Sequence, residues 1–211
     1  MDIYASDDEK GEEIKQWWRD NGRSVIVSIV LSAVVIFAGR YWFNYQATMA
    51  TKASLAYQQL VTLLTEDKKT EADEYMQQLL NDYSNSPYTV FAAFDMAAKS
   101  VEHSDIESSK TKLQWIIEHA ELSGHKALAQ LRLSQLLLAE SKFDQAFDLV
   151  SQKAPGSFAS LFSELQGDIF AAQGKDADAR TAYQTAMMSV GQDQARQQIL
   201  ALKLNDMAIS Q

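Results

Sequence analysis

The hydrophobic residues of this chain follow two different patterns. Residues 24–39 have the sequence SVIVSIVLSAVVIFAG, a continuous run without a charged side chain. From residue 50 onward, apolar residues instead recur every three or four positions between short polar segments. A long uncharged run is typical of a membrane-crossing helix, whereas a spacing of three to four is typical of amphipathic helices. The pattern therefore predicts one membrane helix followed by a helical domain.

The apolar run matches the thickness of a bilayer only when its aromatic flank is included. At 1.5 Å per residue, residues 24–39 span about 24 Å, which is less than a hydrocarbon core of about 30 Å. Arg40 can extend its charge toward the headgroups, and the aromatic residues up to Phe43 are typical of a membrane interface. We therefore predict a transmembrane helix at residues 24–43. A cleaved signal peptide, a buried strand or core helix, and a transit peptide are the alternatives, and the acidic leader and aromatic flank favour none of them.

The basic residues near the span predict its orientation. The residues before it are Lys10, Lys15, Arg19 and Arg23, and those after it are Arg40 and Lys52. Because cytoplasmic flanks carry the excess of Lys and Arg, residues 1–23 are predicted to be a cytoplasmic leader. Residues 44–211 then form an outer domain, which in a bacterium is periplasmic. The expected protein is a single-pass type II protein of the bacterial inner membrane.

Small residues line one side of the predicted span. Ser24, Ser28 and Ser32 follow each other at intervals of four and so share one helix face. Such a face allows a second transmembrane helix to approach closely, and we expect lateral pairing there. Serines tolerated by chance in an apolar helix are the alternative.

The outer domain shows an internal repeat. Its clearest unit is residues 160–189, where small and large residues alternate in the manner of a tetratricopeptide unit: Gly167, Phe170, Gly174, Ala179, Tyr183 and Ala186. The same frame recurs upstream, with small anchor residues at Ala72, Ser109, Ala146 and Ala179. These intervals lie close to the period of about 34 residues that defines the repeat. The predicted fold class is all-α, a tetratricopeptide-like solenoid after a single transmembrane helix, and an unrelated helical bundle is the alternative.

Local signals set the expected boundaries of the repeat. We predict helix pairs near 50–82, 87–119, 125–153 and 157–189, and a capping helix at 192–208. The capping helix is expected to cover the last repeat with Ile199, Leu200, Leu202 and Met207. Capping boxes are predicted at Thr70–Asp73, Ser104–Glu107 and Ser141–Asp144. Ser86 before Pro87 predicts a helix start, and Gly174 predicts a helix end.

Composition and charge exclude several classes of function. The 211 residues include 19 Lys and Arg, 28 Asp and Glu and no cysteine, so the net charge is −9. Nucleic-acid binding requires clustered basic residues, and Cys-ligated zinc requires thiolates. The histidines are His103, His119 and His125, and their spacing does not place two metal ligands on one helix face. With no catalytic or phosphate-binding motif in the sequence, we predict a protein that is not an enzyme and has no metal or cofactor.

The repeat register predicts a protein-binding groove. Helix A positions 2, 5, 9 and 12 of a tetratricopeptide unit line the concave surface, and here they carry no Lys or Arg. They are aromatic and aliphatic in the first three units and become acidic at Glu164 and Asp168. Such a surface suits an apolar partner helix or an unfolded client segment, unless the register is shifted by one residue. The predicted contact residues are Tyr57, Phe91, Phe94, Leu128, Leu131, Gln135 and Leu138.

The chain resembles a known bacterial family most closely in its first 60 residues. The opening MDIYASDDEKGEEIKQWWRDNG, the exit GRYWFNYQ and the following ASLAYQQL are similar to the YfgM family of ancillary Sec translocon subunits. The resemblance implies a single-pass inner-membrane protein with a periplasmic repeat domain. It also implies association with the SecYEG channel and with PpiD, a membrane-anchored periplasmic chaperone of the prolyl-isomerase type. It supplies no catalytic residues.

These observations predict a membrane-tethered adaptor without enzymatic activity. The adaptor is expected to hold a chaperone, or emerging secretory client chains, at the exit of the Sec translocon. Tethering raises the effective concentration of the groove near the channel without any new contact. A periplasmic scaffold for envelope assembly or cell division is the alternative.

Overall fold

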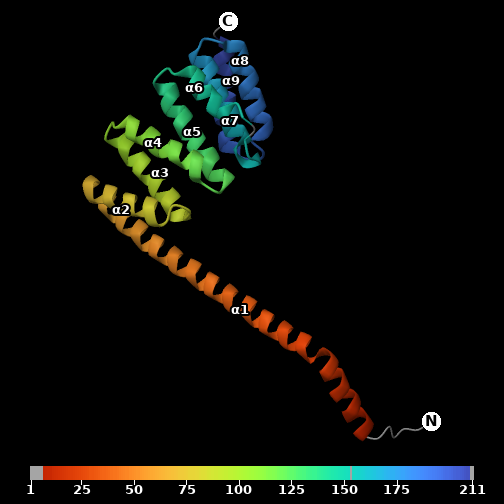
Figure 1. Cartoon of the computed structure of the whole chain (residues 1–211). Coiled ribbons are helices and arrows are strands. Elements are labelled where there is room, and N and C mark those ends of the chain that lie inside the picture. Colours follow the sequence, from red (N-terminus) through yellow and green to blue (C-terminus); the bar gives the residue numbers. More distant parts are fainter. Residues whose placement is uncertain (1–6, 153, 210–211) are drawn as a thin grey trace, which may run out of the picture. The chain divides into compact units, whose positions relative to one another are not determined.

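A computed structural model describes residues 7–152 and 154–209, and all regular elements in that part of the chain are helical (Figure 1). The chain divides into two compact units, residues 1–51 and residues 52–211, which we describe separately. The first six residues of the predicted leader lie outside the described residues.

The first unit is formed by most of the long helix α1, Asp7–Thr65. The predicted leader, from residue 7, and the predicted span are thus one continuous helix. Asn21 and Gly22 lie within it, and the side-chain amide of Asn21 donates to the carbonyl oxygen of Trp17 at 3.2 Å. The indole of Trp18 lies against Gly22. By length and composition, α1 is able to cross a membrane.

The side chains of the span are exposed in the way that lipid contact requires. Large apolar residues such as Ile29 and Phe37 are more than half exposed. The serine hydroxyls are satisfied within the helix: Ser28 donates to the carbonyl oxygen of Ser24, and Ser32 to that of Ser28, each at 2.8 Å. No hydroxyl of these two residues therefore needs water, which makes both compatible with hydrocarbon.

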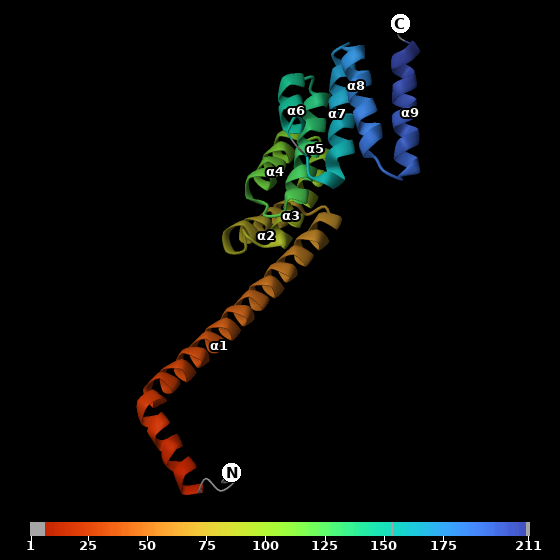
Figure 2. The same cartoon turned by 90° about the vertical axis from the view of Figure 1, so that its right-hand side faces the viewer.

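The second unit is a succession of helix pairs in order of sequence, which runs from α2 on the left to α9 on the right in Figure 2. The end of α1 and α2 contribute to one buried core cluster, and the next pair is α3 with α4. Then come α5 with α6 and α7 with α8, and α9 follows. The bounds are α2 Lys69–Asp82, α3 Pro87–Glu102, α4 Ile106–His119, α5 Ser123–Ala139, α6 Phe143–Val150, a short 3-10 helix Gly156–Phe158, α7 Ala159–Ala172, α8 Asp176–Ser189 and α9 Gln194–Ile209. The predicted all-α repeat fold is confirmed.

The small anchor residues lie where helices cross. Ala72, Ser109, Ala146 and Ala179 are each at most 1 % exposed. Because a small side chain lets two helix backbones approach closely, these residues set the packing of each second helix on its neighbours. The pair of α5 and α6 differs from the others in the length of its second helix. α6 ends at Val150 and has only 8 residues.

The turns inside the helix pairs share one geometry. The second residue after each first helix is left-handed: Asp67 (φ 61°), Ser104 (61°), Ser141 (59°) and Gly174 (71°). The next residue donates its backbone N–H to the carbonyl oxygen five positions back, from Lys68 to Leu63, Asp105 to Ser100, Lys142 to Leu137 and Lys175 to Phe170. This is the Schellman pattern of a helix end. The prediction at Gly174 is therefore confirmed.

The predicted capping boxes are wrong. Ser104 and Ser141 are the left-handed turn residues, and Thr70 lies inside α2, so none of them is a helix N-cap. The N-cap of α4 is Asp105, whose side chain accepts from the backbone N–H of Ser108 at 3.2 Å. The predicted start at Ser86 is confirmed, since its hydroxyl oxygen accepts from the backbone N–H of Tyr88.

The capping helix α9 buries only part of its predicted apolar set. Leu200 is fully buried against α8, and Met207 packs nearby. Ile199 and Leu202 are 46 % and 65 % exposed, which contradicts their expected role. A helix turns by about 100° per residue, so Leu202 lies nearly opposite Leu200 and points away from α8.

The close approach of Tyr183 to Gly167 predicts a sharp sensitivity to substitution at this glycine. A Cβ atom there would overlap the ring of Tyr183, whose Cδ1 would lie 2.5 Å away. We expect Gly167→Ala to lower the free energy of unfolding by about 1–3 kcal/mol through overpacking. Denaturant unfolding of the full chain in nanodiscs, followed by far-ultraviolet circular dichroism, measures the change.

Gly124→Ala is the matched control for this substitution. A Cβ atom at Gly124 would meet only the ring of Phe158, at an ordinary distance of 3.7 Å. Its unfolding midpoint should equal or slightly exceed that of the parent chain, because alanine favours the helix. Equal midpoints for both variants would contradict the close crossing at Gly167.

Candidate functional site

The candidate site is the surface formed by the first helix of each pair in the second unit. Phe91 is 38 % exposed, Gln135 is exposed, and Tyr57, Leu128 and Leu138 are half-buried. Phe94 and Leu131, by contrast, are only 7 % and 6 % exposed. At their position in the helix they face a neighbouring helix, so they support the surface from beneath.

An aromatic cluster forms the centre of this surface. The ring of Phe91 lies 6.2 Å from Tyr57, 6.2 Å from Tyr88 and 5.5 Å from His125, measured between ring centroids. Tyr57 and Tyr88 are 6.0 Å apart. These tilted and edge-on contacts hold the rings of α1, α3 and α5 together.

Two members of the cluster were absent from the sequence-based prediction. Tyr88 precedes Phe91 by three residues, and His125 precedes Leu128 by three residues. Residues three apart share a helix face, so a search one turn before each predicted position would have found both.

A hydrogen bond ties α1 to α3 beneath the aromatic cluster. The hydroxyl of Tyr57 donates to Oδ2 of Asp95 at 2.8 Å. Burial and the neighbouring carboxylate of Asp95 raise the pKa of Tyr57 to about 12. The hydroxyl is therefore protonated at neutral pH and remains a donor.

A cation borders the site beside the counted helix A positions, which themselves carry no Lys or Arg. The guanidinium carbon of Arg132 lies 5.0 Å from the centroid of the Phe94 ring, a cation–π contact. Arg132 is exposed and has no ion pair within the described residues. Arg132 directly follows Leu131 in sequence. It is therefore not one of the helix A positions that were expected to line the groove. The surface therefore presents a positive charge beside its apolar groups.

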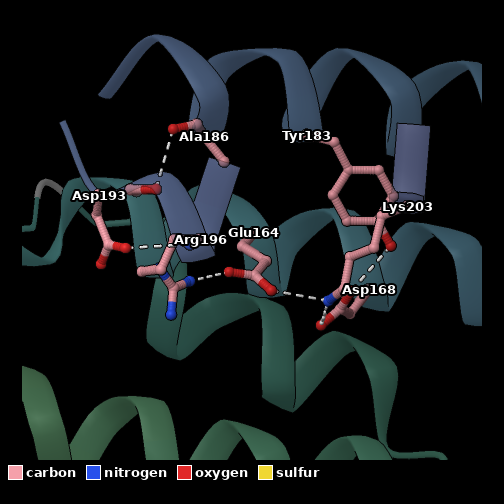
Figure 3. A network of polar contacts seen from close by, with 8 residues as sticks. Glu164, Asp168, Tyr183, Ala186, Asp193, Arg196 and Lys203 are labelled. Carbon is pink, nitrogen blue, oxygen red and sulfur yellow. Dashed lines mark hydrogen bonds and ion pairs between the residues drawn. The ribbon is translucent and has the colours of Figure 1, made fainter. Parts of the chain in front are cut away.

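The acidic end of the predicted groove is neutralised by α9 (Figure 3). Lys203 bonds Oε1 of Glu164 at 2.9 Å and Oδ1 of Asp168 at 2.6 Å, and Arg196 also pairs with Glu164. The hydroxyl of Tyr183 donates to Asp168 at 2.8 Å. Partial burial lowers the pKa of Lys203, but its bonds to these two carboxylates outweigh burial and raise it. The expected acidic surface in the fourth unit is thus occupied by an ion-pair network.

The histidines lie in three separate surroundings. Nε2 of His103 lies 2.9 Å from Asp67, and the ring of His119 stacks on Trp115 at 4.8 Å. His125 belongs to the aromatic cluster. Within the described residues, no group of three or more His, Cys, Asp or Glu side chains is arranged to hold a metal ion.

Known proteins resemble this chain over nearly its whole length. A relative in Haemophilus influenzae is 27 % identical over 98 % of this chain and 100 % of its own. One in Escherichia coli is 24 % identical over 99 % of this chain, and one in Neisseria gonorrhoeae is 23 % identical over 98 %, both over their full length. Each is named as an ancillary SecYEG translocon subunit. These relatives confirm the resemblance carried by the N-terminal 60 residues.

A family model gives the same result for the fold. The tetratricopeptide repeat-like domain model matches residues 15–209. That range includes the helix pairs and most of α1. Because the match covers most of the chain, the chain belongs to the tetratricopeptide repeat-like domain family.

Proposed function

We propose that this chain is a membrane-tethered adaptor of the Sec translocon. In this proposal α1 crosses the inner membrane at residues 24–43, and residues 44–211 lie in the periplasm. The repeat surface binds a PpiD-type chaperone, emerging client segments, or both. The observation that carries the proposal is that one chain has both an exposed aromatic surface and an exposed apolar span. This chain is also similar to proteins named as ancillary SecYEG translocon subunits.

The composition of the repeat surface supports a protein partner. Phe91 and Val101 are 38 % and 41 % exposed and lie on the same helix, α3. Leu128 and Leu138 add half-buried aliphatic area from α5. Contiguous exposed apolar surface marks interaction sites, and aromatic anchors supply much of the affinity of such sites.

The membrane helix supports tethering. A span confines the repeat domain to one membrane, so a weak partner contact becomes effectively intramolecular once both proteins are at the channel. The face of Ser24, Ser28 and Ser32 allows a second membrane helix to approach closely. The hydroxyls of Ser28 and Ser32 donate to carbonyl oxygens of their own helix.

The orientation can be tested with single cysteines, because the native chain has none. We predict that Gln184→Cys reacts with a membrane-impermeant maleimide in intact spheroplasts and that Gln16→Cys reacts only after lysis. The basic residues before the span are the physical reason. The opposite labelling pattern would contradict a periplasmic repeat domain.

The serine face predicts a role in translocon association. Replacing both Ser28 and Ser32 with leucine would separate two closely packed helices, so we expect recovery of SecYEG with the tagged chain to fall several-fold. Quantitative mass spectrometry after gentle detergent extraction measures recovery. Val30→Leu with Val34→Leu adds bulk on the opposite face and should leave recovery unchanged. Equal recovery for both double variants would exclude the serine face as the contact.

The aromatic cluster predicts where a periplasmic partner is captured. A photoreactive side chain at Phe91 should crosslink a PpiD-type chaperone or a secretory chain in native membranes. The same group at Gln78, exposed on α2, is the control and should capture neither. Capture at Phe91 of cell-division or cell-wall proteins alone would reject the adaptor and favour an envelope scaffold.

A further inference from the structure

A second groove lies on the other side of the repeat unit. Its volume is about 740 Å³, and it runs between α4 and α6 over a floor of Leu133 and Leu137 from α5. Leu133 and Leu137 each lie two positions from Gln135, and therefore about 200° around the helix from it. This groove is thus separate from the aromatic surface that includes Phe91.

The helix on one side of the groove, α6, is short. α4 and α8 each have 14 residues, whereas α6 has 8 and ends at Val150. Figure 2 draws α4 and α6 on the same side of α5. The floor lies beside the first two turns of α6, since the hydroxyl of Ser134 donates to the carbonyl oxygen of Ala146 at 2.8 Å.

The apolar walls of the groove are held in place. Trp115 of α4 and Leu149 of α6 line it, and both are half-buried. The indole of Trp115 stacks on the ring of His119 at 4.8 Å with an angle of 9°. His119 is itself fixed by a hydrogen bond of 2.9 Å between its Nδ1 and the carbonyl oxygen of Trp115. The Trp115 wall is therefore preformed, which lowers the entropic cost of binding a ligand.

The charge available in the groove is negative. Glu118 and Asp148 line it, and within the described residues neither carboxylate has a cationic partner. Glu118 only accepts a hydrogen bond from Gln114, at 2.7 Å. Lys110 also lines the groove, but Glu107 and Glu140 already bind its ammonium group at 2.5 and 2.9 Å. Two carboxylates without a cationic partner in the described part of the chain thus border an apolar floor.

Amide side chains complete the rim. Gln145 and Gln152 are exposed and line the groove, and neither side-chain amide has a hydrogen-bond partner within the described part of the chain. A glutamine amide both donates and accepts, which suits the N–H and C=O groups of a peptide backbone. This rim therefore favours a polypeptide as the occupant.

We propose that this groove binds a segment of another protein in which an aliphatic side chain adjoins Lys or Arg. The aliphatic side chain packs between Trp115 and Leu149 on the leucine floor, and the basic group pairs with Glu118 and Asp148. Charge complementarity favours this occupant, because the carboxylates repel acidic segments. The apolar floor disfavours segments that are purely polar. The site does not depend on the translocon role proposed above.

The test uses the full chain in nanodiscs of zwitterionic lipid. The probe is a short fluorescent peptide in which leucines alternate with pairs of lysines, and binding is followed by anisotropy. We expect the double variant Glu118→Lys, Asp148→Lys to bind it at least about tenfold more weakly, a change of about 1.4 kcal/mol. A second peptide, with glutamate in place of each lysine, should bind this variant better than it binds the parent chain.

Matched controls keep the test decisive. Glu74→Lys with Asp82→Lys makes the same charge change on α2, outside the groove, and should leave binding of the lysine peptide unchanged. Trp115→Ala should weaken it, with helicity checked by circular dichroism. Equal weakening by both double variants, or none by either, would overturn the proposal. So would dimerisation of the parent chain that the groove variant abolishes, because the occupant would then be a second copy.

Discussion

The close crossing of helices at small residues is the constraint on which the repeat unit depends. Ala72, Ser109, Ala146 and Ala179 are buried at equivalent places, and each follows a turn whose left-handed residue reverses the chain in the same way. Because the crossing and the turn are the same in each pair, the first helices together form one face of the repeat unit. The second helices form the other face. The aromatic surface and the groove beside α6 both follow from this arrangement.

Sequence reasoning recovered the solenoid because this constraint leaves a visible pattern of small residues. It misassigned the turns for a chemical reason: Ser and Asp serve both as helix N-caps and as residues that tolerate or flank a left-handed backbone. Ser104 and Ser141 are turn residues, and the cap of α4 is the next residue, Asp105. Backbone conformation decides which residue is the left-handed turn residue and which is the N-cap. Residue identity alone does not specify that conformation.

The candidate site was only partly predictable, because its properties arise from residues far apart in sequence. Phe94 and Leu131 have the right chemistry for a groove but are buried by neighbouring helices. Glu164 would be an exposed acid without Arg196 and Lys203, which reach it from α9. The early end of α6 likewise has no signature in the repeat spacing.

In the proposed function, one chain holds the translocon through its span and a second protein through its repeat surface. The most direct measurement places photoreactive side chains at both Ser28 and Phe91 of the same full-length chain, in native membranes. The account predicts a ternary product that contains a SecYEG subunit and a periplasmic chaperone or client. Binary products alone, each excluding the other partner, would contradict it.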